Sequence, residues 1–242
     1  MNGRYEDKST CTFYTKIGAC RHAEKCSRKH IKPTSSYTIL LPNLYQNPKL
    51  NKNNDSTTEF NPKQLQEYFD HFYEDIFIKF ALIGEVVAMV VCENENNHLN
   101  GNVYVKFLEQ ESAFNAVIQL NQEWFSGRPV HCELSPVENF NDANCRAYDN
   151  DSCNRGDHCN FMHVRRPSSS LRSSLFKSQE KSILLKKLQL LNTKPENVQQ
   201  GVSTEQEELD HDQNRETYDN ESATPPSTTT VTTSVVEKLF AT

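Results

Sequence analysis

Cysteine and histidine occur in two sets of nearly identical spacing, one on each side of residues 31–144. The sets are Cys11-x8-Cys20-x5-Cys26-x3-His30 and Cys145-x7-Cys153-x5-Cys159-x3-His163. Three thiolates and one imidazole complete a tetrahedral zinc shell and leave no position open for catalysis. Segments this short bury little apolar surface. Folding units below about 40 residues usually need additional stabilisation, for example by a bound metal ion. The alternative, ordinary thiols and solvent histidines, leaves the repeated spacing unexplained. The sequence predicts two structural zinc ions.

The remaining cysteines and histidines do not form a catalytic metal site. His22 and His158 are rival ligands, but neither lies at the spacing that both sets share. Cys92 and Cys132 fall in predicted strands, where buried thiols are common. A zinc deaminase needs H-x-E followed by P-C-x-x-C; residues 131–133 match the first half, but the sequence contains no C-x-x-C. Since no nucleophile–base arrangement or phosphate-binding loop is evident either, we expect a protein that is not an enzyme and has no small-molecule substrate.

Both Cys/His segments mix aromatic rings with cations. The first carries Phe13, Tyr14, Lys16, Arg21, Lys25, Arg28 and Lys29, and the second carries Arg146, Tyr148, Arg155, Phe161, Arg165 and Arg166. Bases stack on flat rings for about 1–3 kcal/mol each, and cations pair with phosphates. The alternative is a solvated basic surface around a structural metal. The pattern favours binding of single-stranded RNA.

Composition limits where the protein acts and how much of it folds. Of 242 residues, 36% are hydrophobic, below the roughly 45–50% of an average globular domain. We therefore expect the polar residues 193–242 to be disordered. No apolar run approaches the ~18–20 residues that span a bilayer, and the polar N-terminus does not resemble a secretory signal. These features argue against a secreted or membrane protein.

The net charge of −6 hides an asymmetry that suggests two partners. Residues 1–34 hold eight basic and three acidic side chains, whereas residues 35–140 hold six basic and fourteen acidic ones. A basic N-terminal segment followed by an acidic central region is suited to one anionic and one basic partner.

Residues 36–137 alternate between strand and helix patterns. Short apolar runs predict strands at 37–45, 85–94, 101–107 and 127–135, and apolar residues at steps of three and four predict helices at 64–80 and 109–120. The order β-α-β-β-α-β is the plan of the RNA-recognition-motif fold. We predict an α+β chain: an RRM-like domain at 35–140 between Cys3His zinc fingers at 9–33 and 143–166, followed by an amphipathic helix at 168–192.

The predicted central domain has lost most of the side chains with which such a sheet binds RNA. The motif K/R-G-F/Y-G/A-F-V-x-F/Y is replaced here by NGNVYVKF at 100–107. Asn100 stands at the basic position and Asn102 at the first stacking ring, so that Tyr104 alone remains. Leu40 occupies an aromatic position on the first strand. With its acidic charge, we expect this domain not to bind RNA.

The central domain instead offers a surface for a protein partner. Its predicted first helix carries Glu67, Asp70, Glu74 and Asp75, and the triplet Glu123-Trp124-Phe125 holds the only tryptophan of the chain. Tryptophan is over-represented at interface hot spots. The alternatives are a ring folded onto its own core and a solvated acidic helix face. Together these residues suit a basic, aromatic-bearing peptide, and we select Glu67, Asp70, Glu74, Trp124 and Phe125 as partner-binding.

These segments resemble the small subunit of the U2 snRNP auxiliary factor, a splicing factor family. The resemblance covers about residues 9–176 and rests on CTFYTKIGACRHAEKCSRKHIKP, GNVYVKF, WFSGRPVHCELSPV and CNFMH. It implies a nuclear protein whose two fingers together bind the AG at the 3′ splice site of pre-mRNA. By position it points to Phe13, Arg21, Ser27 and Arg28 in the first finger and to Arg146, Arg155, Phe161 and Arg165 in the second.

The resemblance also implies a heterodimer. The central domain, an auxiliary-factor homology motif, would bind the large subunit, whose tryptophan enters a pocket beside the acidic helix while Trp124 packs on the partner's prolines. Two features depart from the family: Glu123 replaces the arginine of an R-x-F triplet, and the Arg-Ser-rich tail is missing. The rival interpretations are a cytoplasmic Cys3His regulator of mRNA that acts without a large subunit and an assembly adaptor that does not contact RNA.

Overall fold

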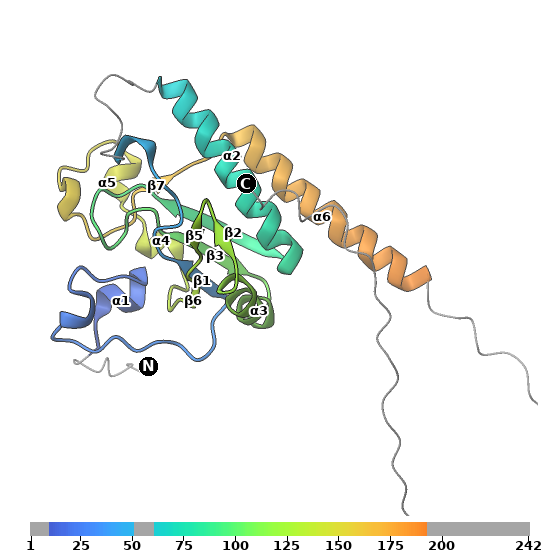
Figure 1. Ribbon diagram of the computed structural model, residues 1–242, viewed down its shortest axis with the longest axis horizontal. Coiled ribbons are helices and arrows are strands. Elements are labelled where there is room, and N and C mark those ends of the chain that lie inside the picture. Colours follow the sequence, from blue (N-terminus) through green and yellow to red (C-terminus); the bar gives the residue numbers. More distant parts are fainter. Residues whose placement is uncertain (1–9, 51–60, 193–242) are drawn as a thin grey trace, which may run out of the picture. The chain divides into compact units, whose positions relative to one another are not determined.

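The computed structural model describes residues 10–50 and 61–192 (Figure 1). Contacts divide the chain into one unit that ends at Leu184 and a second unit that begins at Leu185. The tail that we expected to be disordered, 193–242, lies outside the described residues. Within the described ranges, no helix has both the length and the hydropathy that crossing a membrane requires.

A five-stranded antiparallel sheet forms the centre of the first unit. In spatial order its strands are β6 (Glu133–Leu134), β1 (Thr38–Leu41), β3 (Val103–Phe107), β2 (Val86–Cys92) and β7 (Val164–Arg165). Helices α2 (Pro62–Ile83) and α3 (Gln110–Leu120) pack on one face. The RRM-like β-α-β-β-α-β fold is thereby confirmed, with β7 as an added edge strand.

Helix α2 supplies most of the aromatic core. Its buried stripe contains Phe69, Phe72, Tyr73, Phe77 and Phe80, at helical spacing. The helix begins two residues earlier than we predicted, because Pro62 occupies its first position and a capping box joins Asn61 to Gln64. These polar residues give no apolar periodicity from which the start could be read.

The strand predicted at 127–135 is wrong as a single element. Residues 124–125 (β4, Trp124–Phe125) and 128–129 (β5, Arg128–Pro129) form a separate hairpin, and only β6 joins the main sheet. Ser126 and Gly127 both have positive φ, of 48° and 71°, as a two-residue hairpin turn requires. Trp124 therefore lies on a short strand and not in a loop.

The second face of the sheet is covered by the flanking segments. Leu40, Val90 and Tyr104 point to this face, because they alternate with the core residues on their strands. Ile17 of α1 (Thr12–Ile17), Ala143 of α4 (Phe140–Ala143) and Met162 pack on them. Tyr104 and Met162 are fully buried as a result.

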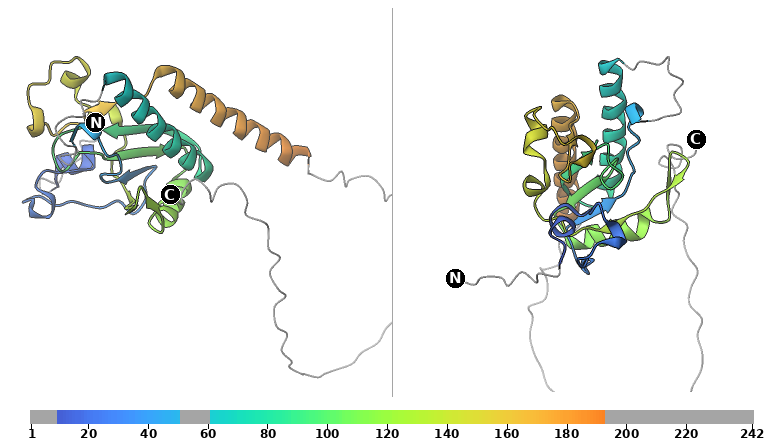
Figure 2. Two further views of the ribbon diagram at one scale, coloured as in Figure 1. Left: turned by 45° about the horizontal axis from the view of Figure 1, so that its top comes forward. Right: turned by 90° about the vertical axis from the view of Figure 1, so that its left-hand side faces the viewer.

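Helix α6 (Ser169–Asn192) follows the second Cys/His segment. Its first half lies against α2 (Figure 2), where Leu175 is buried and Phe176 meets Phe77 with ring centroids 4.9 Å apart. We predicted an amphipathic helix, but only this half is amphipathic toward the core. Ser182, Lys186 and Gln189, which follow Leu175 at helical spacing, are polar.

Candidate metal centres and nucleic-acid interface

The first Cys/His set is brought together by a short helix and a helical turn. Cys11 caps α1, Gly18 ends it in a left-handed conformation, and Cys26 follows the 3-10 turn η1 (Ala23–Lys25). The four ligand atoms of Cys11, Cys20, Cys26 and His30 lie within 4.8 Å of one another. The Sγ atoms of Cys20 and Cys26 are 3.9 Å apart.

The second set has the same construction. Cys145 caps α5 (Arg146–Asp149), and Cys159 follows the 3-10 turn η3 (Gly156–His158). The ligand atoms of Cys145, Cys153, Cys159 and His163 also lie within 4.8 Å of one another. Cys145 Sγ is 3.7 Å from Cys159 Sγ, and Cys153 Sγ is 3.4 Å from His163 Nε2.

These separations match the edges of a zinc tetrahedron. Bonds of about 2.3 Å to sulfur and 2.0–2.1 Å to nitrogen place two sulfurs about 3.8 Å apart, and a sulfur about 3.5 Å from a nitrogen. His30 Nε2 is buried and accepts or donates no hydrogen bond within the described part of the chain, as a ligand nitrogen should. Both sets can therefore hold a metal ion, and the donor chemistry is that of zinc.

The other two cysteines lie outside these clusters. Cys92 and Cys132 are buried in the central domain. Burial raises the pKa of both thiols, that of Cys132 to about 12. They are inert core residues at neutral pH.

A tyrosine stacks on the ligand histidine in each finger, and sequence reasoning missed this role. Tyr14 lies parallel to His30 with ring centroids 4.5 Å apart, and Tyr148 lies parallel to His163 at 4.0 Å. Such contacts orient the ligand ring. The signal was present in the spacing, because each tyrosine follows the first cysteine of its set by three positions.

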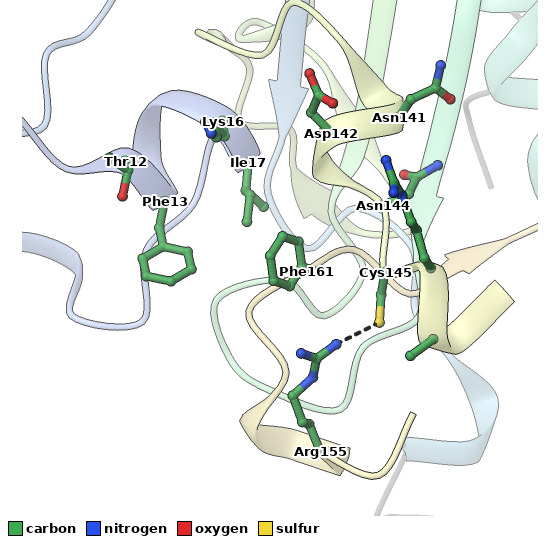
Figure 3. A pocket seen from close by; sticks show the side chains of 12 residues that line it. Thr12, Phe13, Lys16, Ile17, Asn141, Asp142, Asn144, Cys145, Arg155 and Phe161 are labelled. Atoms are coloured by element: carbon green, nitrogen blue, oxygen red, sulfur yellow. Dashed lines mark hydrogen bonds between the residues drawn. The ribbon is translucent and has the colours of Figure 1, made fainter. Parts of the chain in front are cut away.

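A cavity of about 660 Å³ lies between the two fingers (Figure 3). Finger 1 contributes Phe13 and Lys16 from α1, while finger 2 contributes Arg146, Arg155 and Phe161. The guanidinium of Arg155 lies 5.5 Å from the Phe161 ring centroid, and its Nη2 donates to Cys145 Sγ at 3.2 Å. Rings and cations from fingers more than 100 residues apart in sequence thus line one cavity.

The cavity contains four of the eight residues that we expected to contact RNA. Phe13, Arg146, Arg155 and Phe161 line it. Ser27 and Arg28 are exposed elsewhere on finger 1. Arg21 bonds to finger 2, with Nε donating to Asn160 Oδ1 at 2.8 Å.

Arg165 lies in the interior and not at the cavity. It is 9% exposed, forms an ion pair with Glu93 at 3.1 Å and donates to the Leu65 carbonyl at 3.0 Å. Its guanidinium is also 5.0 Å from the Phe69 ring centroid. Strand β7 directs this side chain toward α2, so the structure disagrees with the sequence-based placement of Arg165 among the RNA contacts.

Asparagines of the β2–β3 loop hold finger 2 against the central domain. Asn94 accepts from the His163 N–H at 2.8 Å and donates to the Phe161 carbonyl at 2.9 Å. Asn96 donates to the Cys159 carbonyl at 2.8 Å. These bonds reach the backbone of two metal ligands, and sequence reasoning missed them because the Asn and Glu residues at 93–100 carry no motif or spacing that indicates such contacts.

The proposed partner surface is only partly free. Trp124 is 63% exposed, whereas Phe125 packs on Phe72 with ring centroids 5.9 Å apart. At the base of the hairpin, Glu123 forms an ion pair with Lys79 at 2.7 Å. At its other end, Arg128 donates to the carbonyls of residues 43 and 44. The hairpin is thus fixed at both ends, with the indole outside.

The three acidic residues of this surface differ in their surroundings. Glu67 is exposed and lies 3.8 Å from the Lys63 ammonium. Asp70 accepts from the Ser168 N–H at 2.9 Å and therefore faces the start of α6. Glu74 is half-buried. The expected acidic face is shared between solvent and the start of α6.

Comparison with known proteins gives several strong matches. The chain is 49% identical over 193 residues to the splicing factor U2AF 23 kDa subunit of Schizosaccharomyces pombe, which covers 80% of this chain and 88% of that one. It is 45% identical over 177 residues to the splicing factor U2AF 26 kDa subunit of Homo sapiens, covering 72% and 80%. The alignment with the transcriptional regulator of yeast form adherence 2 of Candida albicans is 33% identical over 337 positions. It covers 84% of this chain and 91% of that one.

No protein-family model matches the chain. Among solved structures, the Rna15 RRM with bound RNA is 15% identical, covers 48% of this chain and 95% of that one, and has a TM-score of 0.26.

Proposed function

The chain belongs to the family of U2AF small subunits, and from that premise we propose that its two fingers bind the AG of a pre-mRNA 3′ splice site while its central domain binds the large subunit. Membership supports an RNA-binding role in splicing and is consistent with a protein that is not an enzyme. The observation that supports our finer proposal is the cavity between the fingers, where aromatic rings and cations from both fingers meet.

We further propose that each Cys3His set binds one Zn²⁺ ion. A structural zinc contributes roughly 10–16 kcal/mol of apparent binding free energy, which becomes folding free energy in so small a unit. Within the protein, Tyr14 and Tyr148 orient the ligand imidazoles. The ions would thereby fix the backbone that carries Phe13 and Phe161 into the cavity.

The lining of the cavity is suited to a short single strand. Phe13 is 40% exposed and Phe161 is half-buried, so both offer a ring face to a base. Arg146 and Arg155 supply guanidinium groups for phosphates. The choice of AG as the sequence comes from the family, and the rings and cations of the wall support binding of a short single strand.

The covered sheet supports the assignment of RNA to the fingers. Tyr104, the one remaining ring at a stacking position, is fully buried beneath Ile17, Gly18 and α4. A base cannot reach it while the fingers are docked. The acidic charge of the domain is therefore not the main reason that its sheet is excluded.

The hairpin supports the central domain as the partner-binding region. A largely exposed indole on a hairpin that is fixed at both ends loses little entropy on association. Tryptophans of this kind commonly anchor interfaces. Since splicing takes place in the nucleus, we also propose a nuclear protein.

The decisive experiment is binding of the zinc-loaded chain, with a large-subunit fragment, to two short RNAs. One ends its pyrimidine run in UAG and the other in UAC. We expect a preference of roughly tenfold or more for UAG, equivalent to about 1.4 kcal/mol, that is lost on chelation. Equal affinity would contradict recognition of AG, and failure to bind either RNA would contradict the RNA proposal.

A pair of substitutions tests the division of roles. Phe161→Ala should weaken RNA binding roughly five- to a hundredfold, since a stacked base contributes about 1–3 kcal/mol, and should leave partner binding unchanged. Trp124→Ala should do the reverse, measured by calorimetry with the large-subunit fragment. If either variant lost both activities while still folded, the separation of the two surfaces would be wrong.

A further inference from the structure

Arg21 joins the two fingers directly. Its Nε donates to Asn160 Oδ1 at 2.8 Å, and its Nη2 donates to the carbonyl of His158 at 2.5 Å. Both acceptors belong to finger 2, and Asn160 directly precedes the cavity residue Phe161. We propose that Arg21 is a positioning residue, which sets finger 1 against finger 2 so that the cavity is formed before RNA binds. This inference rests on the proposed RNA-binding function of the cavity.

Apart from Arg21, finger 1 meets the rest of the described protein mainly through one apolar patch at the end of α1, which packs on the sheet and on α4. Ile17 is buried on the sheet, and Gly18 packs so tightly that an added Cβ would lie 3.0 Å from the Tyr104 ring and 2.8 Å from Ser135 Oγ. These neighbouring residues form one apolar pivot. The ion pair of Lys32 with Glu133 is exposed, and exposed pairs constrain little.

A guanidinium suits the task of preventing rotation about this pivot. Its donors lie in one rigid plane, so two bonds to two acceptors define an orientation as well as a distance. His98 of the β2–β3 loop lies beside this contact, and its pKa is lowered by its own burial and by the charge of Arg21. A neutral imidazole does not repel the guanidinium. Segments from finger 1, finger 2 and the central domain therefore meet at this point.

The alternative role for Arg21 is direct contact with RNA, as the family resemblance implies. A guanidinium has five N–H groups, and Arg21 uses two of them within the protein. The two roles make different demands on Asn160. A phosphate contact by Arg21 does not need Asn160, whereas a positioning role does.

The experiment uses the full zinc-loaded chain and measures amide hydrogen exchange of residues 12–17 without RNA, and then affinity for the UAG RNA. Asn160→Ala removes the acceptor and no charge. We expect faster exchange in 12–17 and RNA binding weakened roughly three- to tenfold, the fold-change of one ordinary hydrogen bond. Arg21→Ala should have the same effects, and the double variant should add little, since both substitutions break one contact.

Two further variants separate the roles. Arg21→Lys keeps the charge and loses the fork, so positioning predicts an Ala-like result whereas phosphate contact predicts near-normal affinity. Arg28→Ala removes an exposed arginine of the same finger and should leave exchange in 12–17 unchanged.

Weaker RNA binding by Arg21→Ala with unchanged exchange would overturn the proposal. Because the exchange measurement needs no RNA, failure of the RNA-binding proposal would be seen separately. Circular dichroism and zinc content show that each variant has folded.

Discussion

Fingers 1 and 2 have the same ligands, the same closing spacing and the same tyrosine stacked on the ligand histidine, yet they are attached to the central domain in different ways. Finger 2 continues into β7, which pairs with β2 through Val91 and Arg165. It is also held by the buried Asn94 and Asn96. Finger 1 packs on the sheet and on α4 through Ile17, Gly18 and Ala19, and its polar contacts through Arg21 and Lys32 are exposed.

This difference in attachment shows that the local fold of a finger and its connection to the central domain are determined separately. Ligand spacing determines the local fold of a finger, and that fold is nearly the same in both. The surroundings determine whether a finger is part of a larger folding unit. We infer that finger 2 folds together with the central sheet and that finger 1 docks onto it.

The largest expected effect comes from removing the third cysteine of each set. Cys159→Ser should unfold finger 2 and release β7, so amide exchange in β2 should accelerate. Cys26→Ser should unfold finger 1 and leave exchange in β2 near normal. Each variant should lose one zinc ion, and with it a contribution on the order of 10 kcal/mol to the folding of that finger. Similar exchange of β2 in both variants would remove the distinction between the fingers.

The next effect concerns the buried ion pair beneath finger 2. Arg165→Ala leaves the carboxylate of Glu93, whose side chain is 16% exposed, without its cation. Breaking such a pair costs about 3 kcal/mol or more, measured by urea unfolding. RNA affinity of the folded protein should not change, because Arg165 lies outside the cavity. The double variant Arg165→Met, Glu93→Gln should recover much of the stability, and an RNA defect without instability would restore Arg165 as an RNA contact.

Arg165 also illustrates what sequence can and cannot reveal. The eight candidate ligands, the α2 stripe and the β-α-β-β-α-β order of elements along the chain follow from local spacing, which a sequence displays directly. An arginine beside a metal ligand looks the same whether it faces RNA or the interior. Its direction is set by β7 pairing with β2, a contact between segments more than 70 residues apart.

Tyr104 shows the same limit on the central sheet. Its position on β3 was predictable, and the acidic charge of the domain predicted that RNA does not bind there. Its burial depends on Ile17 and Met162, which come from opposite ends of the described chain. Sequence periodicity does not show which segments will cover a sheet face.

An effect of comparable size is expected at Asn94, which is fully buried. Asn94→Ala leaves the His163 N–H and the Phe161 carbonyl without their partner, which costs about 1–3 kcal/mol per unsatisfied group. The exposed Asn97 of the same loop provides the matched control, and Asn97→Ala should change stability by less than about 0.5 kcal/mol. Urea midpoints of both variants test this. Equal midpoints would mean that the loop does not hold finger 2.

The smallest effect should be at Lys32, where the chain leaves finger 1. Its ion pair with Glu133 measures 2.9 Å, but the two side chains are 75% and 37% exposed. We expect Lys32→Ala to cost at most about 1 kcal/mol, as exposed pairs do, and the loss to shrink as salt is added.

The stability that the Lys32–Glu133 ion pair contributes should not change with pH near neutrality. The hydrogen bond and charge of Glu133 raise the pKa of Lys32. A raised lysine pKa contributes stability fully below the unfolded pKa of about 10.4 and loses it only as pH rises beyond that value. Between pH 6 and 9, urea midpoints of Lys32→Ala and the parent protein should therefore differ by a constant amount. A loss as large as that of Arg165→Ala, or one insensitive to salt, would show that finger 1 is attached as firmly as finger 2 and would break the comparison.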